Sequence, residues 1–213
     1  MMRIVPLFLL AAGFLLSPST AEAKEPSADI LKVARAIPDG GSYVWKGESG
    51  SPREIRHDGE LIVKAQSKGS YCSGFTFCVA MEAAQQRGLL RGKSPDEVRA
   101  FQKQWYGSTE EAAERQCALA VETLGIGQEV KPLAKGRAGD FVQIWRTNKT
   151  GHSVMLLDWV REGKQIVGIR YRSSQKSTDG VGDRTEYFSD AAGHDGKVDR
   201  ARTYVARLDR GRR

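Results

Sequence analysis

The stretch that follows Cys72 is apolar on nearly every side. Residues 73–87 have the length of one helix and end at Gly88, and the first turns carry Phe75, Phe77, Cys78, Val79 and Met81. A helix without a polar face cannot lie on a surface, so the rest of the domain must enclose it. The pattern therefore predicts a central, largely buried helix over 73–87, with Cys72 at its mouth.

The segments around this helix divide into early helices and late strands. Before it, we expect a short amphipathic helix over 27–37, a strand over 42–46 and a hairpin over 53–64 that turns at Asp58-Gly59. Capping boxes that begin at Ser94 and Ser108 predict helices over 95–106 and 109–124. Period-two alternation then predicts antiparallel strands over 140–146, 152–160, 165–173, 186–188 and 202–208. This order is typical of an α+β domain.

The N-terminal residues predict export. Arg3 precedes an apolar core over 4–16, and Ala21-Glu22-Ala23 supplies small residues for a signal peptidase. We therefore expect a signal peptide over 1–23 and a secreted or periplasmic protein. The apolar run is short for a membrane span and contains proline and glycine, so we expect no stable span after cleavage; an uncleaved anchor is the alternative.

The mature chain of about 190 residues suits a single globular domain. Residues 24–60 would add an N-terminal helix and strands to a main body over 61–213. The net charge of +7 suits an anionic partner, but the lysines and arginines are scattered without aromatic interleaving. A solubilised surface is the simpler interpretation, and export argues against nucleic acid. We expect a monomer.

Three cysteines in an exported chain leave at least one thiol unpaired within it. Cys72 and Cys78 would be separated by a rise of about 9 Å on one helix, which is too far for a disulfide. Cys117 lies on the apolar face of the expected helix 109–124. Cys78 and Cys117 could bridge two packed helices, or both could be small buried hydrophobes.

Cys72 is the candidate nucleophile. At a helix start, unpaired backbone N–H groups and the positive end of the helix dipole favour thiolate over thiol. A thiol also needs a base, and His152 heads the expected strand 152–160. His57 and His194 lie in segments that read as solvated loops, so we consider them poorer candidates.

A third group usually orients the imidazole, and the neighbouring strand offers two candidates at its end. Ser173 and Gln175 share one face of that strand. We favour Gln175, because its amide oxygen can accept the Nδ1–H of an imidazole without adding charge; Ser173 is the alternative. Backbone N–H groups at the helix start, with Ser73 and Tyr71 beside the cysteine, are the candidates for oxyanion and substrate contacts. The cysteines and histidines lack ligand spacing, so we expect no metal site.

Three short motifs are similar to those of known enzymes. Cys-Ser-Gly-Phe at 72–75, Ala-Gly-Asp-Phe-Val at 138–142 and Gly-His-Ser-Val at 151–154 resemble the NlpC-type and CHAP-type cell-wall cysteine hydrolases, over roughly residues 60–175. The resemblance implies a papain-like core, with a helix that bears the cysteine packed on an antiparallel sheet of about five strands. It also implies cleavage of amide bonds in peptidoglycan peptides without a cofactor, with Cys72 as nucleophile, His152 as base and Gln175 as orienting residue.

The chain departs from the NlpC-type pattern at several points. Tyr71 stands where aspartate often precedes the cysteine, and the third residue is more often histidine, asparagine or glutamate than glutamine. The two helices expected between 94 and 124 are a long insertion for the minimal fold. Two alternatives therefore stay open: the same three residues acting on another acyl substrate, and a non-catalytic secreted binding module in which Cys72 is a buried core thiol.

Overall fold

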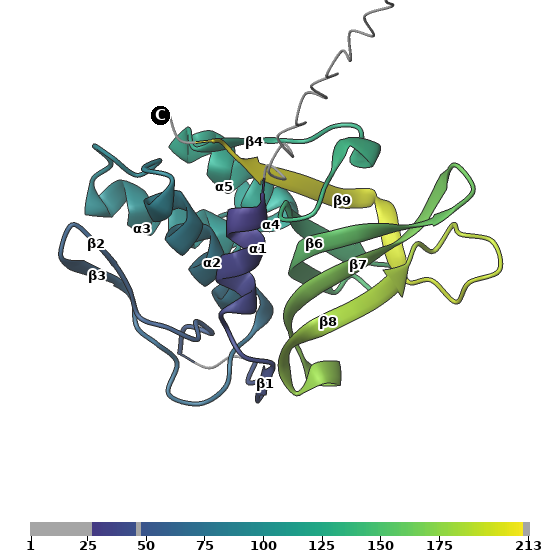
Figure 1. The fold of residues 1–213 in the computed structure, drawn as a ribbon, viewed down its shortest axis with the longest axis horizontal. Coiled ribbons are helices and arrows are strands. Elements are labelled where there is room, and N and C mark those ends of the chain that lie inside the picture. Colours follow the sequence, from purple (N-terminus) through teal and green to yellow (C-terminus); the bar gives the residue numbers. More distant parts are fainter. Residues whose placement is uncertain (1–26, 46–47, 211–213) are drawn as a thin grey trace, which may run out of the picture.

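The computed structural model describes residues 27–45 and 48–210 (Figure 1). The expected signal peptide, residues 1–23, lies outside the described residues. None of the helices within the described ranges has the length and apolar composition needed to cross a bilayer.

Within these ranges the chain forms five α-helices and two β-sheets. The helices are α1 Ala28–Arg35, α2 Cys72–Gln86, α3 Pro95–Trp105, α4 Ala112–Arg115 and α5 Cys117–Leu124, with 3-10 turns η1 Leu133–Lys135 and η2 Lys176–Thr178. The strands are β1 Gly40–Gly41, β2 Ile55–His57, β3 Glu60–Val63, β4 Gly127–Glu129, β5 Phe141–Arg146, β6 Gly151–Glu162, β7 Gln165–Gln175, β8 Gly180–Tyr187 and β9 Val198–Leu208.

The main sheet is antiparallel and has the strand order β1-β8-β7-β6-β5-β9-β4, while β2 and β3 form a separate hairpin. The α+β class and the antiparallel sheet are confirmed. The expectation of about five strands was too low, because the described sheet contains seven. The two additional strands, β1 and β4, are the shortest and lie at the sheet edges. Segments of two or three residues carry too little alternation to be recognised in a sequence.

Helix α2 occupies the centre of the helical layer, as its composition predicts. All but three of its residues are buried, and it packs against α1, β6 and β7. Figure 1 shows the helices gathered on one side of the molecule and the long strands β6 to β9 on the other. Arg172 of β7 is fully buried and donates to the carbonyl oxygens of Ala34 and Ile37, which joins the end of α1 to the sheet.

The sheet has an apolar layer on each face. Alternate residues of a strand point to opposite faces, so Phe141 and Met155 pack with the helices while Val142 and Val154 belong to a second cluster. The second cluster also includes residues from outside the strands, such as Val130 and Ala191, and Phe188 just after β8 bridges to Val198 at the start of β9. Both layers hold the strands that carry the site in fixed positions.

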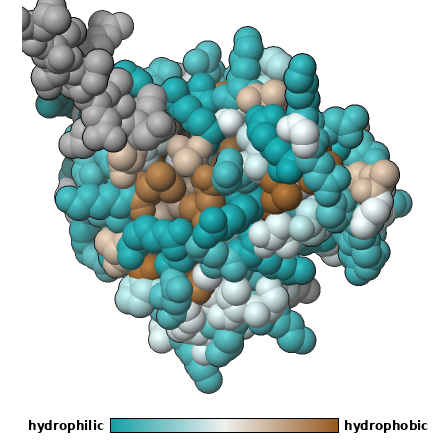
Figure 2. All heavy atoms as spheres, turned by 45° about the vertical axis from the view of Figure 1, so that its right-hand side comes forward, coloured by the Kyte–Doolittle hydropathy of each residue, from teal (hydrophilic) through white to brown (hydrophobic). Residues whose placement is uncertain are grey.

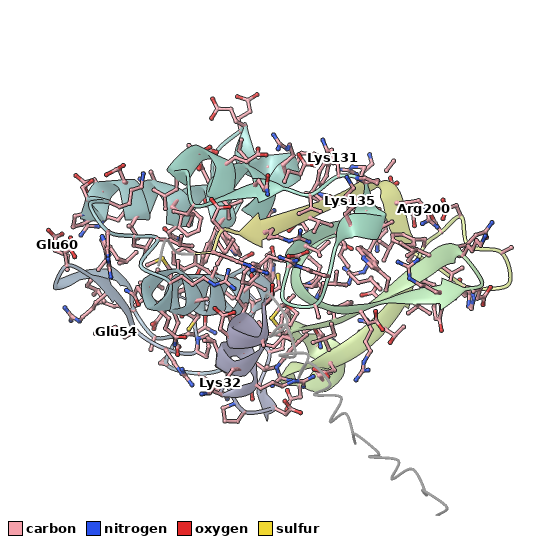
Figure 3. All side chains as sticks on the ribbon, turned by 45° about the horizontal axis from the view of Figure 1, so that its top comes forward. Lys32, Glu54, Glu60, Lys131, Lys135 and Arg200 are labelled. Atoms are coloured by element: carbon pink, nitrogen blue, oxygen red, sulfur yellow. The ribbon has the colours of Figure 1, made fainter. Side chains whose placement is uncertain are left out.

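Charged side chains cover the outside. In Figure 3, Lys32, Glu54 and Glu60 lie at the outside of the molecule, so side chains of both signs are found at its surface. On the face drawn in Figure 2, hydrophilic residues predominate and apolar ones form small separate groups. This arrangement agrees with the interpretation of the net charge as a solubilised surface.

The structure corrects three expected elements. The strand expected over 186–188 is only the last part of β8, which begins at Gly180 and ends at Tyr187. Over its described part, residues 42–45, the expected strand 42–46 is wrong: Tyr43 makes a single bridge to Ser70, and Ser42 has a φ of 72°, which is not an extended conformation. The expected helix over 109–124 is divided into α4 and α5 at Gln116, whose φ of 37° is not helical. The capping box at Ser94 is present, whereas Glu111, which precedes α4, makes no side-chain cap.

Candidate active site

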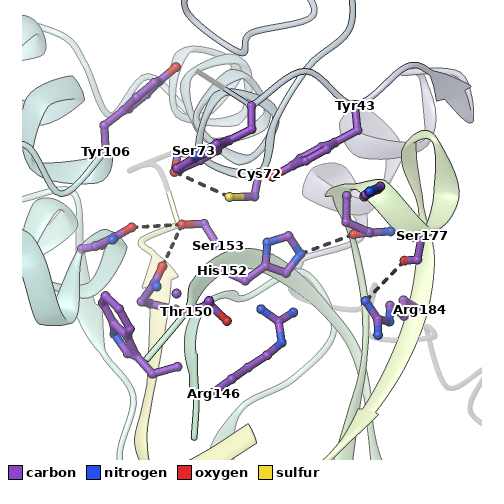
Figure 4. Close-up of a pocket in the computed structure, with 17 residues that line it drawn as sticks. Tyr43, Cys72, Ser73, Tyr106, Arg146, Thr150, His152, Ser153, Ser177 and Arg184 are labelled. Atoms are coloured by element: carbon purple, nitrogen blue, oxygen red, sulfur yellow. Dashed lines mark hydrogen bonds between the residues drawn. The ribbon is translucent and has the colours of Figure 1, made fainter. Parts of the chain in front are cut away.

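A cavity of about 710 Å³ lies where the start of α2 meets the beginning of β6 and the end of β7. Cys72, His152 and Gln175 all line it, together with Ser73 (Figure 4). These residues are up to 103 positions apart in the chain. The fold therefore brings the three residues of the expected constellation to one place.

Cys72 is the first residue of α2 and is only 5% exposed. Its Sγ lies 3.9 Å from Oγ of Ser73, and the backbone N–H of Ser153 donates to the sulfur. Burial raises the pKa of the Cys72 thiol, and the hydrogen bonds from Ser153 and Ser73 oppose this effect only in part. The expected shift toward thiolate is therefore wrong in direction. The resting group is a thiol and needs a base to become a nucleophile.

Gly74 explains the glycine of the Cys-Ser-Gly-Phe motif. A Cβ at this position would lie 2.1 Å from the carbonyl carbon of Gly50 and 2.5 Å from the backbone nitrogen of Ser51. The segment at 50–51 thus crosses the first turn of α2 in direct backbone contact, and Tyr71 donates its N–H to the carbonyl oxygen of Gly50. Only glycine permits this approach at the start of the nucleophile helix.

We expect Gly74→Ala to lower the free energy of unfolding by about 1–3 kcal/mol, since the added methyl must displace backbone. Urea unfolding followed by circular dichroism measures the change. Ser73→Ala is the matched control, because it alters the neighbouring residue without adding atoms, and it should change stability by less than about 1 kcal/mol. Equal stability of Gly74→Ala and the unmodified protein would contradict the contact.

His152 is buried near the start of β6, with its ring edge-on to Tyr171 at a centroid distance of 5.6 Å. Burial lowers the pKa of His152 to about 3, and the positive charge of Arg146 acts in the same direction, while Glu186 and Gln175 oppose it. The imidazole is therefore neutral at neutral pH. A neutral ring can accept the proton of a thiol.

The hydrogen bonds of Gln175 determine which ring nitrogen of His152 carries the hydrogen. Its Nε2 donates to Oγ1 of Thr178 at 2.6 Å and to the carbonyl oxygen of Gly182 at 3.2 Å, so its Oε1 is left to accept from Nε2 of His152 at 3.4 Å. These bonds assign the hydrogen of the neutral ring to Nε2. The expectation that the amide binds Nδ1 is therefore wrong: Nδ1 is the unprotonated nitrogen, and it lies on the side of the ring toward Cys72 (Figure 4).

Ser173 has a different partner. Its Oγ donates to the carbonyl oxygen of Ser153 at 2.7 Å, so it joins β7 to β6 and does not contact the imidazole. The other two histidines lie outside the cavity. His57 is buried, with Nε2 2.7 Å from the carbonyl oxygen of Lys93, so its expected solvated loop is wrong. His194 is at the surface, where it pairs with Glu162 and stacks on Tyr187.

Tyr71 does not line this cavity. Its ring lies between Trp45 and Tyr106, at centroid distances of 5.4 and 6.1 Å. Tyr71 instead caps the helix, since its carbonyl oxygen accepts from the N–H of Phe75. Of the two candidates beside the cysteine, Ser73 faces the cavity and Tyr71 supports the helix start.

Sequence reasoning missed several residues of the site. Tyr43 lines the cavity, and Figure 4 shows its hydroxyl directed toward Cys72. Burial raises the pKa of Tyr43, and the neighbouring Cys72 adds to the effect, so its O–H remains a donor. Ser153 donates to the side-chain oxygens of Gln116 and Gln143, both in the cavity wall. The backbone of Gln116, at φ 37° and ψ −106°, is what breaks the predicted helix.

A buried ion pair supports the histidine. Glu186 accepts from Nε and Nη2 of Arg146 at 2.7 and 2.6 Å and from the hydroxyl of Tyr171 at 2.5 Å. Burial would raise the pKa of Glu186, but the bonds from Arg146 and Tyr171 lower it to about 2. No spacing signal in the sequence connects these three residues. Their contact depends on which strands lie side by side and in which register, and the sequence alone does not show this.

Cys78 and Cys117 are both buried free thiols. Cys78 lies beside Ser51 and Arg53, whereas Cys117 lies near Gln143 and has a pKa raised to about 12 by burial. The structure therefore agrees with the interpretation as small buried hydrophobes and not with a bridge. Among the residues described, histidine, cysteine and carboxylate side chains nowhere form a group of three that could hold a metal ion.

Comparisons of the chain with protein-family models, with curated proteins and with solved structures find no match.

Proposed function

We propose that this protein is an exported cysteine hydrolase that cleaves amide bonds in peptidoglycan peptides, on a papain-like core of the NlpC or CHAP type. The observation that carries the proposal is the convergence of Cys72, His152 and Gln175 on one cavity. The Cys-Ser-Gly-Phe and Gly-His-Ser-Val motifs, which suggested the cell-wall substrate, contribute residues to that cavity. Export rests on the sequence of residues 1–23 alone.

The geometry supports a two-step acyl transfer. Nδ1 of His152 takes the proton of Cys72 as the sulfur attacks the carbonyl carbon, and the hydrogen bond from Nε2–H to Gln175 holds the ring. Backbone N–H groups at the start of α2 and the Tyr43 hydroxyl are donors available to the oxyanion. The imidazolium then protonates the leaving amine, the C–N bond breaks, and a thioester remains on Cys72. Water, deprotonated by His152, hydrolyses the thioester and restores the thiol.

One observation favours the rival class, a secreted binding module without activity. Cys72 is nearly enclosed and burial raises its pKa, as for a structural thiol. A buried structural cysteine would not, however, require an imidazole held by an oriented amide beside it. The hydrolase therefore remains the better account of the whole site.

Digestion of purified peptidoglycan, followed by mass analysis of the released fragments, tests the proposal. We expect the intact protein to release fragments that carry a new free amine and a new carboxylate, and Cys72→Ala to release none. The masses identify the bond. If neither protein releases fragments although the Cys72 thiol reacts with small electrophiles, the cell-wall assignment is overturned. The protein would then be a hydrolase that acts on another acyl substrate.

We expect Gln175→Ala to lower kcat by about 10- to 100-fold with little change in KM, because the ring loses its orienting acceptor and not a substrate contact. Steady-state rates on the released-fragment assay give both constants. Ser173→Ala is the matched control, since the Ser173 hydroxyl donates to the Ser153 carbonyl oxygen rather than to the imidazole, and it should cost much less. A silent Gln175→Ala with a crippled Ser173→Ala would transfer the orienting role to Ser173.

A further inference from the structure

The charged groups that line the cavity all have the same sign. The lining residues include three cations, Arg146, Lys176 and Arg184. Among the described residues, no aspartate or glutamate lines the cavity. The start of α2 opens into the same space and adds the positive end of its dipole. A substrate in this cavity therefore meets a positive potential.

The three cations differ in how far they are neutralised. Arg146 is paired with Glu186 through two hydrogen bonds. Arg184 lies 3.8 Å from the same carboxylate, whose oxygens already accept from Arg146 and Tyr171, and its Nη1 donates to Ser177 at 3.3 Å. Lys176 makes no ion pair within the described residues and is exposed. Lys176 and Arg184 are thus the positive charges left for a ligand.

Their position is fixed relative to the reacting groups. Lys176 directly follows Gln175 at the end of β7, and Arg184 lies on β8, the strand paired with β7. Figure 4 shows Arg184 and Ser177 together on the side of His152 away from Ser153. Aromatic and neutral polar residues form the other walls: Tyr43, Trp45, Tyr106, Gln116, Gln143, Trp145. The uncompensated charge is therefore confined to the end of the cavity beyond the imidazole.

We propose that the substrate carries a carboxylate close to its scissile amide, and that Lys176 and Arg184 bind it on the His152 side. A guanidinium presents paired donors that match a carboxylate, and Ser177 adds a hydroxyl beside it. This inference rests on the proposed hydrolase function, and it narrows the substrate to acidic peptides or similar acyl compounds. A substrate without a carboxylate on that side of its scissile amide would bind less tightly.

Alkylation of Cys72 by two small reagents tests the inference without a substrate. Iodoacetate and iodoacetamide each form a bond from the thiolate sulfur to their methylene carbon with loss of iodide, and they differ only in a carboxylate against a neutral amide. The ratio of their rate constants at Cys72, measured at pH 8 by peptide mapping and divided by the same ratio for 2-mercaptoethanol, reports the preference for the carboxylate.

We expect this normalised ratio to exceed one, to fall about three- to tenfold in Lys176→Gln and in Arg184→Gln, and to fall in 0.5 M NaCl. Lys164→Gln and Arg161→Gln remove the same charge from exposed positions at the far end of β6, so the ratio should not change. A ratio that is the same in all five proteins would overturn the carboxylate inference alone. A Cys72 that reacts with neither reagent would overturn the nucleophile assignment and this inference with it.

Discussion

Replacing His152 with alanine is expected to lower turnover by about a thousandfold or more, because His152 is the only imidazole among the described residues that line the cavity, and burial has raised the pKa of the Cys72 thiol. The rate of fragment release from the natural substrate measures the loss. The remaining activity should rise with pH, since hydroxide must now deprotonate the thiol. Circular dichroism should show an unchanged fold, because the ring is replaced at a strand end.

The other two histidines provide matched controls. His194→Ala removes a surface ring that pairs with Glu162, and His57→Ala removes a buried bond to the Lys93 carbonyl. His57→Ala should cost some stability, but neither variant should alter kcat. If His57→Ala loses as much turnover as His152→Ala while both proteins stay folded, the assignment of His152 as the base is wrong.

Glu186→Gln should lower the free energy of unfolding by about 3 kcal/mol, since it leaves Arg146 without its counter-charge. The side chains of Glu186 and Arg146 are only 8% and 16% exposed, so water can replace little of the lost interaction. Urea unfolding at pH 7 measures the change. Glu162→Gln is the control, because Glu162 pairs at the surface with His194 and should contribute less than about 1 kcal/mol.

The same pair predicts how stability depends on pH. Hydrogen bonds from Arg146 and Tyr171 overcome the effect of burial and hold the pKa of Glu186 at about 2, below its ordinary value of 4.5. A depressed pKa stabilises the folded state above the unfolded value, and this contribution is lost as pH falls from about 4.5 to about 2. Between pH 4.5 and about pH 2, the free energy of unfolding should therefore fall less in Glu186→Gln than in the unmodified protein. An equal loss in both proteins would contradict the role of the pair.

Much of the fold could be predicted because its signals are local. The apolar stretch after Cys72 requires burial, Ser94 and Gly125 delimit helices through caps that form, and the hairpin turns at Asp58-Gly59 as expected. The strands β5, β6, β7 and β9 overlap strands expected from the sequence, although burial on both faces of the sheet leaves little strict alternation in β5, β6 and β7. Local patterns also place Cys72 at a helix start and His152 near the beginning of a strand.

The remainder depends on tertiary contacts. The break at Gln116 is set by the cavity wall, where Gln116 accepts from Ser153, and no helix-breaking residue marks it in the sequence. Glu186 meets Arg146 across strands that are not neighbours in the chain. Tyr43 lines the same cavity as Cys72 and follows three residues at positive φ, Gly40, Gly41 and Ser42. None of these pairings has a characteristic spacing.

The pKa of Cys72 shows why an electrostatic argument from sequence alone gave the wrong direction. A helix start stabilises a negative charge by about 0.3–1 kcal/mol. Loss of hydration at a buried site can move a pKa by as much as 3–5 units, which is several times larger. The sequence identifies the helix start but not the depth of burial, and burial decides the sign. The site is therefore a neutral thiol and a neutral imidazole rather than an ion pair.

Site-resolved alkylation of the native protein tests most directly the claim that Cys72 is a nucleophile activated by His152. The protein and its His152→Ala variant are treated with iodoacetamide at pH 8, and peptide mapping follows the modification of each cysteine with time. We predict that Cys72 is modified first, that Cys78 and Cys117 react only after unfolding, and that His152→Ala slows the modification of Cys72. Equal labelling of the three cysteines, no labelling of Cys72, or an unchanged rate in His152→Ala would contradict the account.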